Sequence, residues 1–228
     1  IRERGIESCA STVGRIIRYL KRTGDLVEPS TRVKSTKRRK RYYAIRKPKD
    51  WEVSKPGDLV QIDTLDIRPI PGLILKQFTA RDLISKWDVI EARSRATSHT
   101  AKEFLDTLYR KMPFKIRAIQ VDGGSEFYSE FERECMSRGI KLFVLPPKSP
   151  KLNGCVERAQ RTHREEFYEL CDISWTVPEL NKELRQWEYT YNCVRPHQAI
   201  GYKTPLQFLK DSGIIDNYSN PSYLSHMS

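Results

Sequence analysis

The segment LVQIDTLDI (59–67) opens the succession of short apolar runs that decides the fold of this chain. A Pro-Ile-Pro-Gly turn at 69–72 separates it from LILKQFTA (73–80), and KWDVIEAR (86–93) follows. Runs of about four to eight residues, rich in β-branched and aromatic side chains and bounded by turn residues, are typical of strands. The sequence therefore predicts three antiparallel strands over this region.

Beyond residue 93 the pattern alternates between helix and strand. Apolar residues that recur at three- and four-residue spacing indicate the helices. The expected elements are, in chain order, a helix carrying Ala101, Leu105, Leu108 and Met112, a strand at 115–121, a helix carrying Phe127, Phe131 and Cys135, a strand at 140–145, and a long helix from about Asn153 to Leu170. This βββαβαβα order predicts one α/β domain with a mixed five-stranded sheet and flanking helices.

The composition excludes several classes of protein. Of the 228 residues, 38% are hydrophobic and 10% aromatic, which is enough for a core and excludes a wholly disordered chain. No apolar run approaches the roughly 18–20 residues that cross a bilayer, and the N-terminus lacks the apolar stretch of a signal peptide. We therefore expect a cytoplasmic protein without a membrane partner. The chain begins with Ile1 rather than Met, as a fragment would.

The cysteines and histidines predict neither a disulfide framework nor a zinc site. Five cysteines and four histidines are scattered along the chain, without a Cys-x-x-Cys pair. We expect reduced and mostly structural thiols, as is usual in the cytosol.

The net charge of +12 lies entirely in the first fifth of the chain. Residues 1–49 hold 16 Lys and Arg against 4 Asp and Glu, whereas residues 50–228 hold 25 of each. A block of ten basic residues without an acid, as in 32–49, has the form of an arm that binds phosphates. Two tyrosines that could stack on bases follow its densest part, and the alternatives are a solvated linker or a localisation tag. The expected DNA contacts are Lys37, Arg38, Arg39, Lys40 and Arg41.

A short amphipathic helix is expected upstream of this arm. Ser11 or Thr12 is positioned to cap it, and Gly24 would end it. A capped short helix that displays basic residues suits the second helix of a helix-turn-helix, with Arg15 and Arg18 as DNA contacts. An ordinary amphipathic helix fits the same pattern.

Three carboxylates are candidates for one site. Asp63 lies within a predicted strand, Asp122 follows the end of another, and Glu157 lies near the start of the long helix. Such positions can converge at the rim of an α/β sheet. Converging carboxylates repel one another unless a cation joins them, and oxygen ligands favour Mg²⁺ or Mn²⁺. With 29 acids in the chain, however, such a trio also arises by chance, and Asp66, Asp82 and Asp88 are treated as structural.

The long helix is expected to have two different faces. Glu157, Arg161 and Arg164 fall within one arc, so a metal ligand would lie beside two cations that bind DNA phosphates. Pairing of these arginines with neighbouring glutamates is the alternative. The opposite arc carries Val156, Ala159, His163, Phe167 and Leu170, with the histidine in the core. Asn153 is expected to cap this helix.

Three phrases of this sequence resemble, in order, those of bacterial insertion-sequence transposases with an integrase core. They are VDGGSEF (121–127), LPPKSPKLNGCVERAQRTHREEF (145–167) and YNCVRPHQAIGYKTPLQFL (191–209). The resemblance runs from roughly Trp51 to Leu209. Asp63, Asp122 and Glu157, with 34 residues between the last two, resemble the aspartate-aspartate-glutamate triad of the retroviral-integrase superfamily.

This resemblance implies a ribonuclease H-like fold and a DNA transposase that uses two Mg²⁺ ions, for which Mn²⁺ could substitute. In that family the first aspartate bridges both ions, while the second aspartate and the glutamate each hold one; by match these are Asp63, Asp122 and Glu157. Such an enzyme cleaves the element ends and joins the 3′-OH to target DNA by phosphoryl transfer. Basic residues at the offsets of Arg161 and Arg164 contact DNA ends in related integrases.

The implied partners are double-stranded DNA and further copies of the chain on that DNA. The expected organisation is a partial helix-turn-helix at 1–29, a basic linker at 30–50, a catalytic core at 51–210 and a tail at 211–228. Within the core, Arg195, Pro196 and His197 belong to a family signature that we expect to close the fold. Two alternatives to the transposase are a repressor that binds DNA without chemistry and a nuclease that only hydrolyses.

Overall fold

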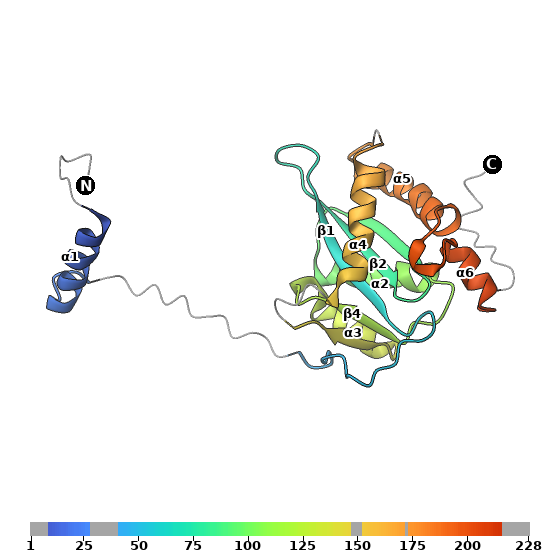
Figure 1. Ribbon diagram of the computed structural model, residues 1–228, viewed down its shortest axis with the longest axis horizontal. Coiled ribbons are helices and arrows are strands. Elements are labelled where there is room, and N and C mark those ends of the chain that lie inside the picture. The colour runs from blue at the N-terminus through green and yellow to red at the C-terminus, as the bar shows by residue number, and fades with distance from the viewer. Residues whose placement is uncertain (1–8, 28–40, 147–151, 172, 216–228) are drawn as a thin grey trace. The chain divides into compact units, whose positions relative to one another are not determined.

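The strands form one mixed five-stranded sheet in the computed structural model, which describes residues 9–27, 41–146, 152–171 and 173–215 (Figure 1). The sheet consists of β1 (Val60–Ile67), β2 (Leu75–Asp82), β3 (Asp88–Arg93), β4 (Ala118–Val121) and β5 (Lys141–Val144), in the order β3-β2-β1-β4-β5. β1, β2 and β3 pair antiparallel, and β4 and β5 continue the sheet in parallel with β1. The predicted α/β fold with a mixed five-stranded sheet is confirmed.

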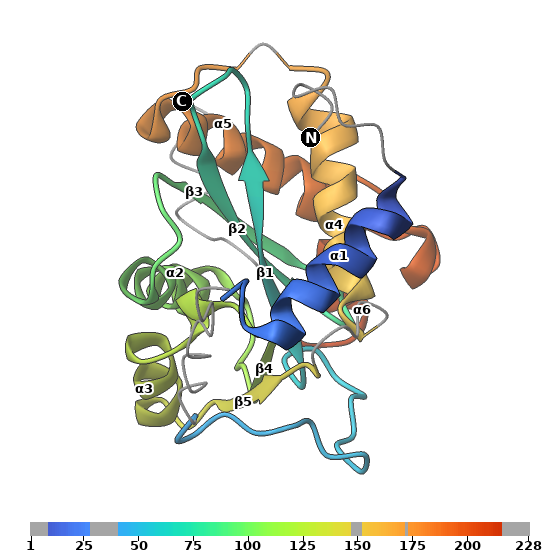
Figure 2. The ribbon, with the colours of Figure 1, turned by 90° about the vertical axis from the view of Figure 1, so that its left-hand side faces the viewer.

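Helices cover both faces of this sheet, as Figure 2 shows. α2 (Ser98–Lys111) and α3 (Glu130–Ser137) pack on one face, and α4 (Gly154–His163) and α5 (Val177–Tyr189) pack on the other. The alternation of β1 explains the two layers, because successive side chains of a strand point to opposite faces. Val60 and Ile62 belong to the core beneath α2 and α3, and the intervening positions face α4.

Local capping explains where two of the helices begin. Thr97 precedes α2 and exchanges hydrogen bonds with Thr100 in a capping box. Thr204 and Gln207 do the same for α6 (Pro205–Asp211), where proline occupies the first turn. The long helix predicted to reach Leu170 is α4 followed by a π-helical turn, η4 (Arg164–Tyr168).

The N-terminal unit, residues 1–40, contains α1 (Ala10–Thr23). Gly24 ends this helix in a left-handed conformation with φ of 84°, as predicted. The prediction of a Ser11 or Thr12 cap is wrong, because Cys9 occupies the N-cap position and no side chain caps the helix.

The second unit begins at Arg41, about ten residues before the boundary expected at Trp51. The backbone of Ile45 pairs with β5, donating to Leu142 O and accepting from Val144 N. Buried Glu132 of α3 accepts hydrogen bonds from the backbone amides of Tyr43 and Ala44. The end of the basic segment is therefore fixed to the sheet edge by backbone contacts that its charge pattern does not reveal.

Candidate active site

The two aspartates lie on neighbouring parallel strands. The pairing of β1 with β4 ends at Ile62 opposite Val121, and Asp63 and Asp122 are the next residues on each strand. Adjacent strands are about 4.8 Å apart, so the two carboxylates start from neighbouring positions on the same face. The structure thus brings together two of the three predicted ligands through strand register alone.

Two buried glutamines attach the start of α4 above these aspartates. Gln61 and Gln120 are register partners, and each side chain donates to the carbonyl oxygen of Leu152, at 2.7 and 2.8 Å. Gln61 also accepts from the backbone amide of Val156 at 3.1 Å. Because Glu157 follows in the first turn of α4, these bonds hold the third carboxylate near the strand ends. Sequence reasoning missed both glutamines, although a Gln-x-Asp pattern occurs in both strands.

The carboxyl group of Asp63 is half-buried, and its environment opposes ionisation. Burial and the nearby carboxylates of Asp122, Glu157 and Glu126 together raise the pKa of Asp63 to about 7, against the lowering effect of the backbone amide of Thr64, which donates to it at 2.8 Å. Like charges thus converge on Asp63. A site of this kind stabilises a bound cation, because the cation relieves the repulsion.

Glu126 is a fourth carboxylate at this site, and sequence reasoning did not identify it. Its side chain accepts a hydrogen bond from the Thr64 hydroxyl at 3.0 Å. A Cβ atom added at Gly124 would lie 2.6 Å from the Glu126 carboxylate and 2.9 Å from that of Asp122. Glycine therefore allows both acids to approach the loop, while its own amide donates to Asp122 at 2.8 Å. The Gly-Gly pair that follows Asp122 was the available signal.

Asn153 has a different role from the one predicted. It occupies the N-cap position of α4, but its side chain makes no capping hydrogen bond. Instead, Nδ2 donates to the Asp63 carboxylate at 3.2 Å. The other amide atom, Oδ1, is buried and has no hydrogen-bond partner among the described residues. A polar oxygen without a partner beside the carboxylates is a further potential ligand atom.

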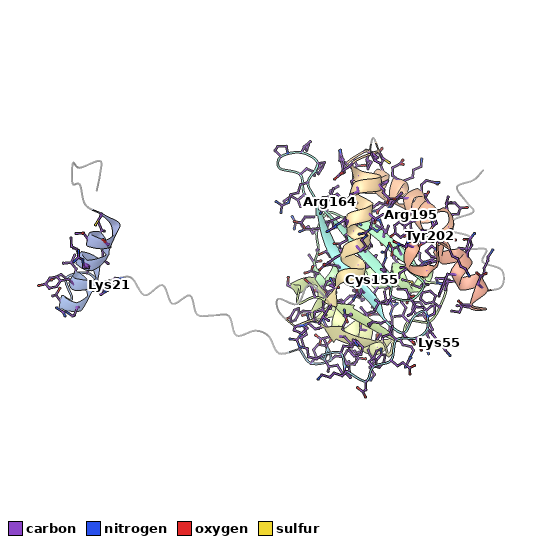
Figure 3. All side chains as sticks on the ribbon, in the orientation of Figure 1. Lys21, Lys55, Cys155, Arg164, Arg195 and Tyr202 are labelled. Atoms are coloured by element: carbon purple, nitrogen blue, oxygen red, sulfur yellow. The ribbon has the colours of Figure 1, made fainter. Side chains whose placement is uncertain are left out.

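Most residues of α4 and η4 have the exposure that the sequence predicted. Glu157, Arg161 and Arg164 are exposed, and neither arginine forms an ion pair within the part of the chain that the structure describes. Figure 3 shows Arg164, the first residue of η4, directly after α4. Val156, Ala159, His163 and Phe167 are buried as predicted. Leu170 is not: it is 75% exposed, because η4 widens the helix and ends before this residue.

A buried polar network holds α4 against β2 and β3. Arg81 forms a bidentate ion pair with Asp88 at 2.6 and 2.7 Å. Nε2 of His163 lies 3.2 Å from the same carboxylate, and Nδ1 accepts from the indole of Trp187 at 2.9 Å. Burial lowers the pKa of His163, so the ring is neutral at physiological pH. The predicted structural role of Asp88 and core position of His163 are confirmed.

The other acids and the C-terminal signature are also structural. Asp82 accepts from the backbone amides of Gly57 and Ser85, and Asp66 pairs with exposed basic residues. Arg195 pairs with Glu166, and His197 contacts the carbonyl oxygen of Tyr191 at 3.1 Å. These contacts join the end of the domain to the α4 layer.

The described residues contain no group of three or more His, Cys, Asp or Glu side chains arranged to hold a metal ion. The donor set nevertheless fits a hard divalent cation, because the atoms at this rim are carboxylate and amide oxygens and their repulsion is otherwise unrelieved. Asp63 and Asp122 would form the core of such a site.

The N-terminal residues predicted to contact DNA have three different outcomes. Arg15 and Arg18 are exposed on α1. Lys37, Arg38, Arg39 and Lys40 lie outside the described residues. Arg41 is packed against the domain: it donates to the Phe127 carbonyl at 2.9 Å, and its guanidinium lies 3.7 Å from the centre of the Tyr128 ring. A DNA contact by Arg41 remains a prediction. No helix in the described ranges is long and apolar enough to span a bilayer.

Comparison with known proteins finds an integrase domain, a viral integrase and an insertion-element protein among those similar to this chain. Residues 138–205 match the family described as integrase core domain. The ORF3 protein of Spiroplasma virus SpV1-C74, which is named as an integrase, is 27% identical over 113 residues, 44% of this chain and 31% of the relative. A 39.2 kDa protein of insertion element IS476 from Xanthomonas euvesicatoria is 28% identical over 95 residues, 40% of this chain and 27% of the relative. The matches thus cover less than a third of each relative's length.

Solved integrase structures share the fold. One is the simian T-cell lymphotropic virus intasome in complex with a PP2A regulatory subunit, with a TM-score of 0.58 and 19% identity over 74% of this chain and 58% of the other. The catalytic core domain of BIV integrase has a TM-score of 0.53 and 21% identity, and the match covers 68% of this chain and 95% of the other. The HTLV-2 integrase catalytic core domain in complex with magnesium has a TM-score of 0.52 and 19% identity. The match covers 67% of this chain and 96% of the other. Residues 138–205 are therefore similar to the integrase core domain, and the described domain has the ribonuclease H-like fold of retroviral integrase catalytic cores.

Proposed function

We propose that this protein is a DNA transposase that cuts the ends of a mobile element and joins them to target DNA. One observation carries the proposal: Asp63 and Asp122 lie next to each other where the parallel pairing of β1 with β4 ends, and Gln61 and Gln120 attach the start of α4, with Glu157 in its first turn, above them. The integrase family match and the insertion-element relative support the same reaction class.

Asp63, Asp122 and Glu157 would hold the divalent cations, Mg²⁺ or Mn²⁺, that this chemistry uses. The magnesium complex of the HTLV-2 integrase core, which has the same fold, supports this choice of metal. When bound, such ions activate the attacking oxygen and neutralise charge on the leaving oxygen of a phosphodiester. Glu157 is exposed at the start of α4, so its side chain is free to turn toward the strand ends when the ions bind.

The remaining residues of the site would orient the acids and the DNA. Asn153 and Thr64 hold the Asp63 carboxylate by hydrogen bonds, which fixes its two oxygens. Arg161 and Arg164 project from the same exposed face of α4 as Glu157 and would bind phosphates on either side of the scissile bond. The basic segment at 32–49 would add contacts to the DNA backbone that depend on salt.

Double-stranded DNA is thus the proposed substrate, both as element end and as target. A transposase joins two ends at once, so we propose that several copies of the chain assemble on DNA. The similarity of the fold to a viral intasome is consistent with such an assembly.

A strand-joining assay tests this proposal. A labelled duplex that ends in the element's terminal inverted repeat is incubated with target plasmid and Mg²⁺, and joined products are resolved on a gel. Glu157→Gln should lower joining by roughly 100-fold or more while DNA binding persists, because only a metal ligand is lost. Glu165→Gln, a change at an exposed glutamate of η4, directly after α4, is the matched control and should join normally.

Three results would contradict the proposal. Wild-type joining by Glu157→Gln would remove the carboxylate from the chemistry. Cleaved but never joined products would identify a nuclease that only hydrolyses. Binding without cleavage under any divalent metal would favour a repressor.

A further inference from the structure

A cavity lies beside α4, and none of the carboxylates of the candidate active site lines it. It has a volume of about 680 Å³ and is formed by the first two turns of α4, the turn between β2 and β3, and the segment that follows Arg195. Cys155 and Arg158 line it from α4, whereas Glu157 does not. Figure 3 shows Cys155, Arg195 and Tyr202 on this side of the domain.

The charge of the cavity wall is positive. The lining residues include four cations, Arg81, Lys86, Arg158 and Arg195, and no carboxylate. Arg81 forms an ion pair with buried Asp88, and Arg195 forms one with Glu166; neither acid lines the cavity. Lys86 and Arg158 form no ion pair with any described residue, and Lys86 instead donates to the Leu83 carbonyl oxygen.

Two further features define the charge that the cavity offers to a ligand. Burial lowers the pKa of His197, which also lines the cavity, to about 4, so its neutral ring does not add to the charge. The two cations that remain are on long side chains at separate elements, one in a turn and one on a helix, which suits a ligand with several negative groups more than a single small ion.

Tyr202 at the rim of the cavity has an unfavourable backbone conformation. Its φ is 58°, in the left-handed region that large side chains disfavour, and the preceding Gly201 has φ of 70°. The tyrosine side chain is 68% exposed, so core packing does not explain the residue. Strained residues that persist on a surface often have a binding role. An aromatic ring beside a basic cavity is able to stack on sugars or bases.

We propose that this cavity binds the sugar–phosphate backbone of double-stranded DNA at a position outside the scissile phosphate. Lys86 and Arg158 bind phosphates, and the ring of Tyr202 packs against a neighbouring nucleotide. The inference rests on the proposed function in that DNA is the substrate. Because Arg158 directly follows Glu157 on α4, a duplex that reaches the carboxylate rim passes within reach of this cavity.

Salt-dependent DNA binding tests the two cations. Fluorescence anisotropy with a labelled duplex, in the presence of a chelator to prevent chemistry, gives the slope of log K against log salt. That slope falls by about 0.9 for each lost phosphate contact, so the Lys86→Gln, Arg158→Gln double variant should lose about 1.8. Arg133→Gln on α3, which is exposed on the other face of the sheet and lacks an ion pair among the described residues, is the control and should keep the wild-type slope.

Two more measurements localise the contact. Bound duplex should protect Cys155 from alkylation, measured by peptide mass spectrometry, and the double variant should lose this protection. Tyr202→Asn, which accepts the left-handed conformation without the ring, should raise the melting temperature and weaken binding of the duplex.

The inference is overturned if the double variant keeps the wild-type slope and Cys155 stays unprotected. It is also overturned if inorganic phosphate binds the cavity, detected by calorimetry and lost in the double variant, while the duplex does not. These results are independent of joining activity, so a failure of the transposase proposal and a failure of this one remain distinguishable.

Discussion

Replacing Asp63 by asparagine should stabilise the metal-free protein, and the gain should depend on pH. Burial and three neighbouring carboxylates raise the pKa of Asp63 from its ordinary value of 3.8 to about 7 in the folded protein. Between these two pH values the folded protein keeps a proton that the unfolded chain has lost. The stability of the wild type therefore falls as pH rises from about 4 to about 7 and levels off above it.

The size of the effect follows from the pKa difference. Each unit of pKa corresponds to about 1.4 kcal/mol, so the free energy of unfolding of the wild type loses at most about 4 kcal/mol over this range. Asp63→Asn removes the titration. The new amide also finds a partner, because the Asn153 side chain can turn its unpaired Oδ1 toward it. The variant should thus resemble the wild type at pH 4 and exceed it by up to about 4 kcal/mol at pH 8.

Urea unfolding in a chelating buffer at several pH values measures this difference. Asp66→Asn on the same strand is the control, because the pKa of Asp66 is shifted in the opposite direction and its replacement should therefore destabilise the protein. Hydrogen bonds from Lys76 and Arg68 lower the pKa of Asp66, so its removal should cost up to about 1 kcal/mol at pH 7 and nothing at low pH. Addition of Mg²⁺ should stabilise the wild type more than Asp63→Asn. A stability difference for Asp63→Asn that does not change with pH would refute the reasoning.

Three further substitutions test the framework around the site by urea unfolding. Gln61→Met should lower the free energy of unfolding by about 2 kcal/mol, because the buried backbone amide of Val156 loses its acceptor, while Gln120 still donates to the Leu152 carbonyl oxygen. It should also lower joining more than DNA binding, and unchanged joining would contradict its positioning role. Gly57→Ala should lower the free energy of unfolding by well over about 2 kcal/mol, because a Cβ atom there would lie 2.1 Å from the Lys115 carbonyl oxygen. Gly72 has the same φ of 87° but open space around it, so Gly72→Ala should lower it by only about 1 kcal/mol. Equal losses for the two variants would be inconsistent with the clash. Arg81→Met should lower the free energy of unfolding by about 3–5 kcal/mol, because Asp88 stays buried without its ion-pair partner. Adding Asp88→Leu should recover part of this loss. The absence of recovery would argue against an ion-pair effect.

The strong local and periodic signals of the sequence predicted much of this molecule. Strand alternation and helix periodicity depend on neighbouring residues, so the order of elements and the mixed five-stranded sheet could be read directly. The same holds for the exposed arc of Glu157, Arg161 and Arg164, because the periodicity of a helix fixes which residues share a face. Asp63 and Asp122 became candidates through their positions within and after strands, and the resemblance to integrase-core transposases distinguished them from the other acids.

Contacts between distant segments could be decided only by the tertiary structure. Gln61 and Gln120 read as ordinary polar residues until strand register places them together under the Leu152 carbonyl oxygen, 32 residues from the nearer of the two. Asn153 was predicted to cap a helix, yet the neighbouring strand offers its side chain a carboxylate instead. Glu126 joins the site because a glycine loop folds back, and the cavity beside Arg158 combines three segments far apart in the chain. Local sequence determines which elements form, whereas the packing of those elements determines which side chains lie close enough to interact.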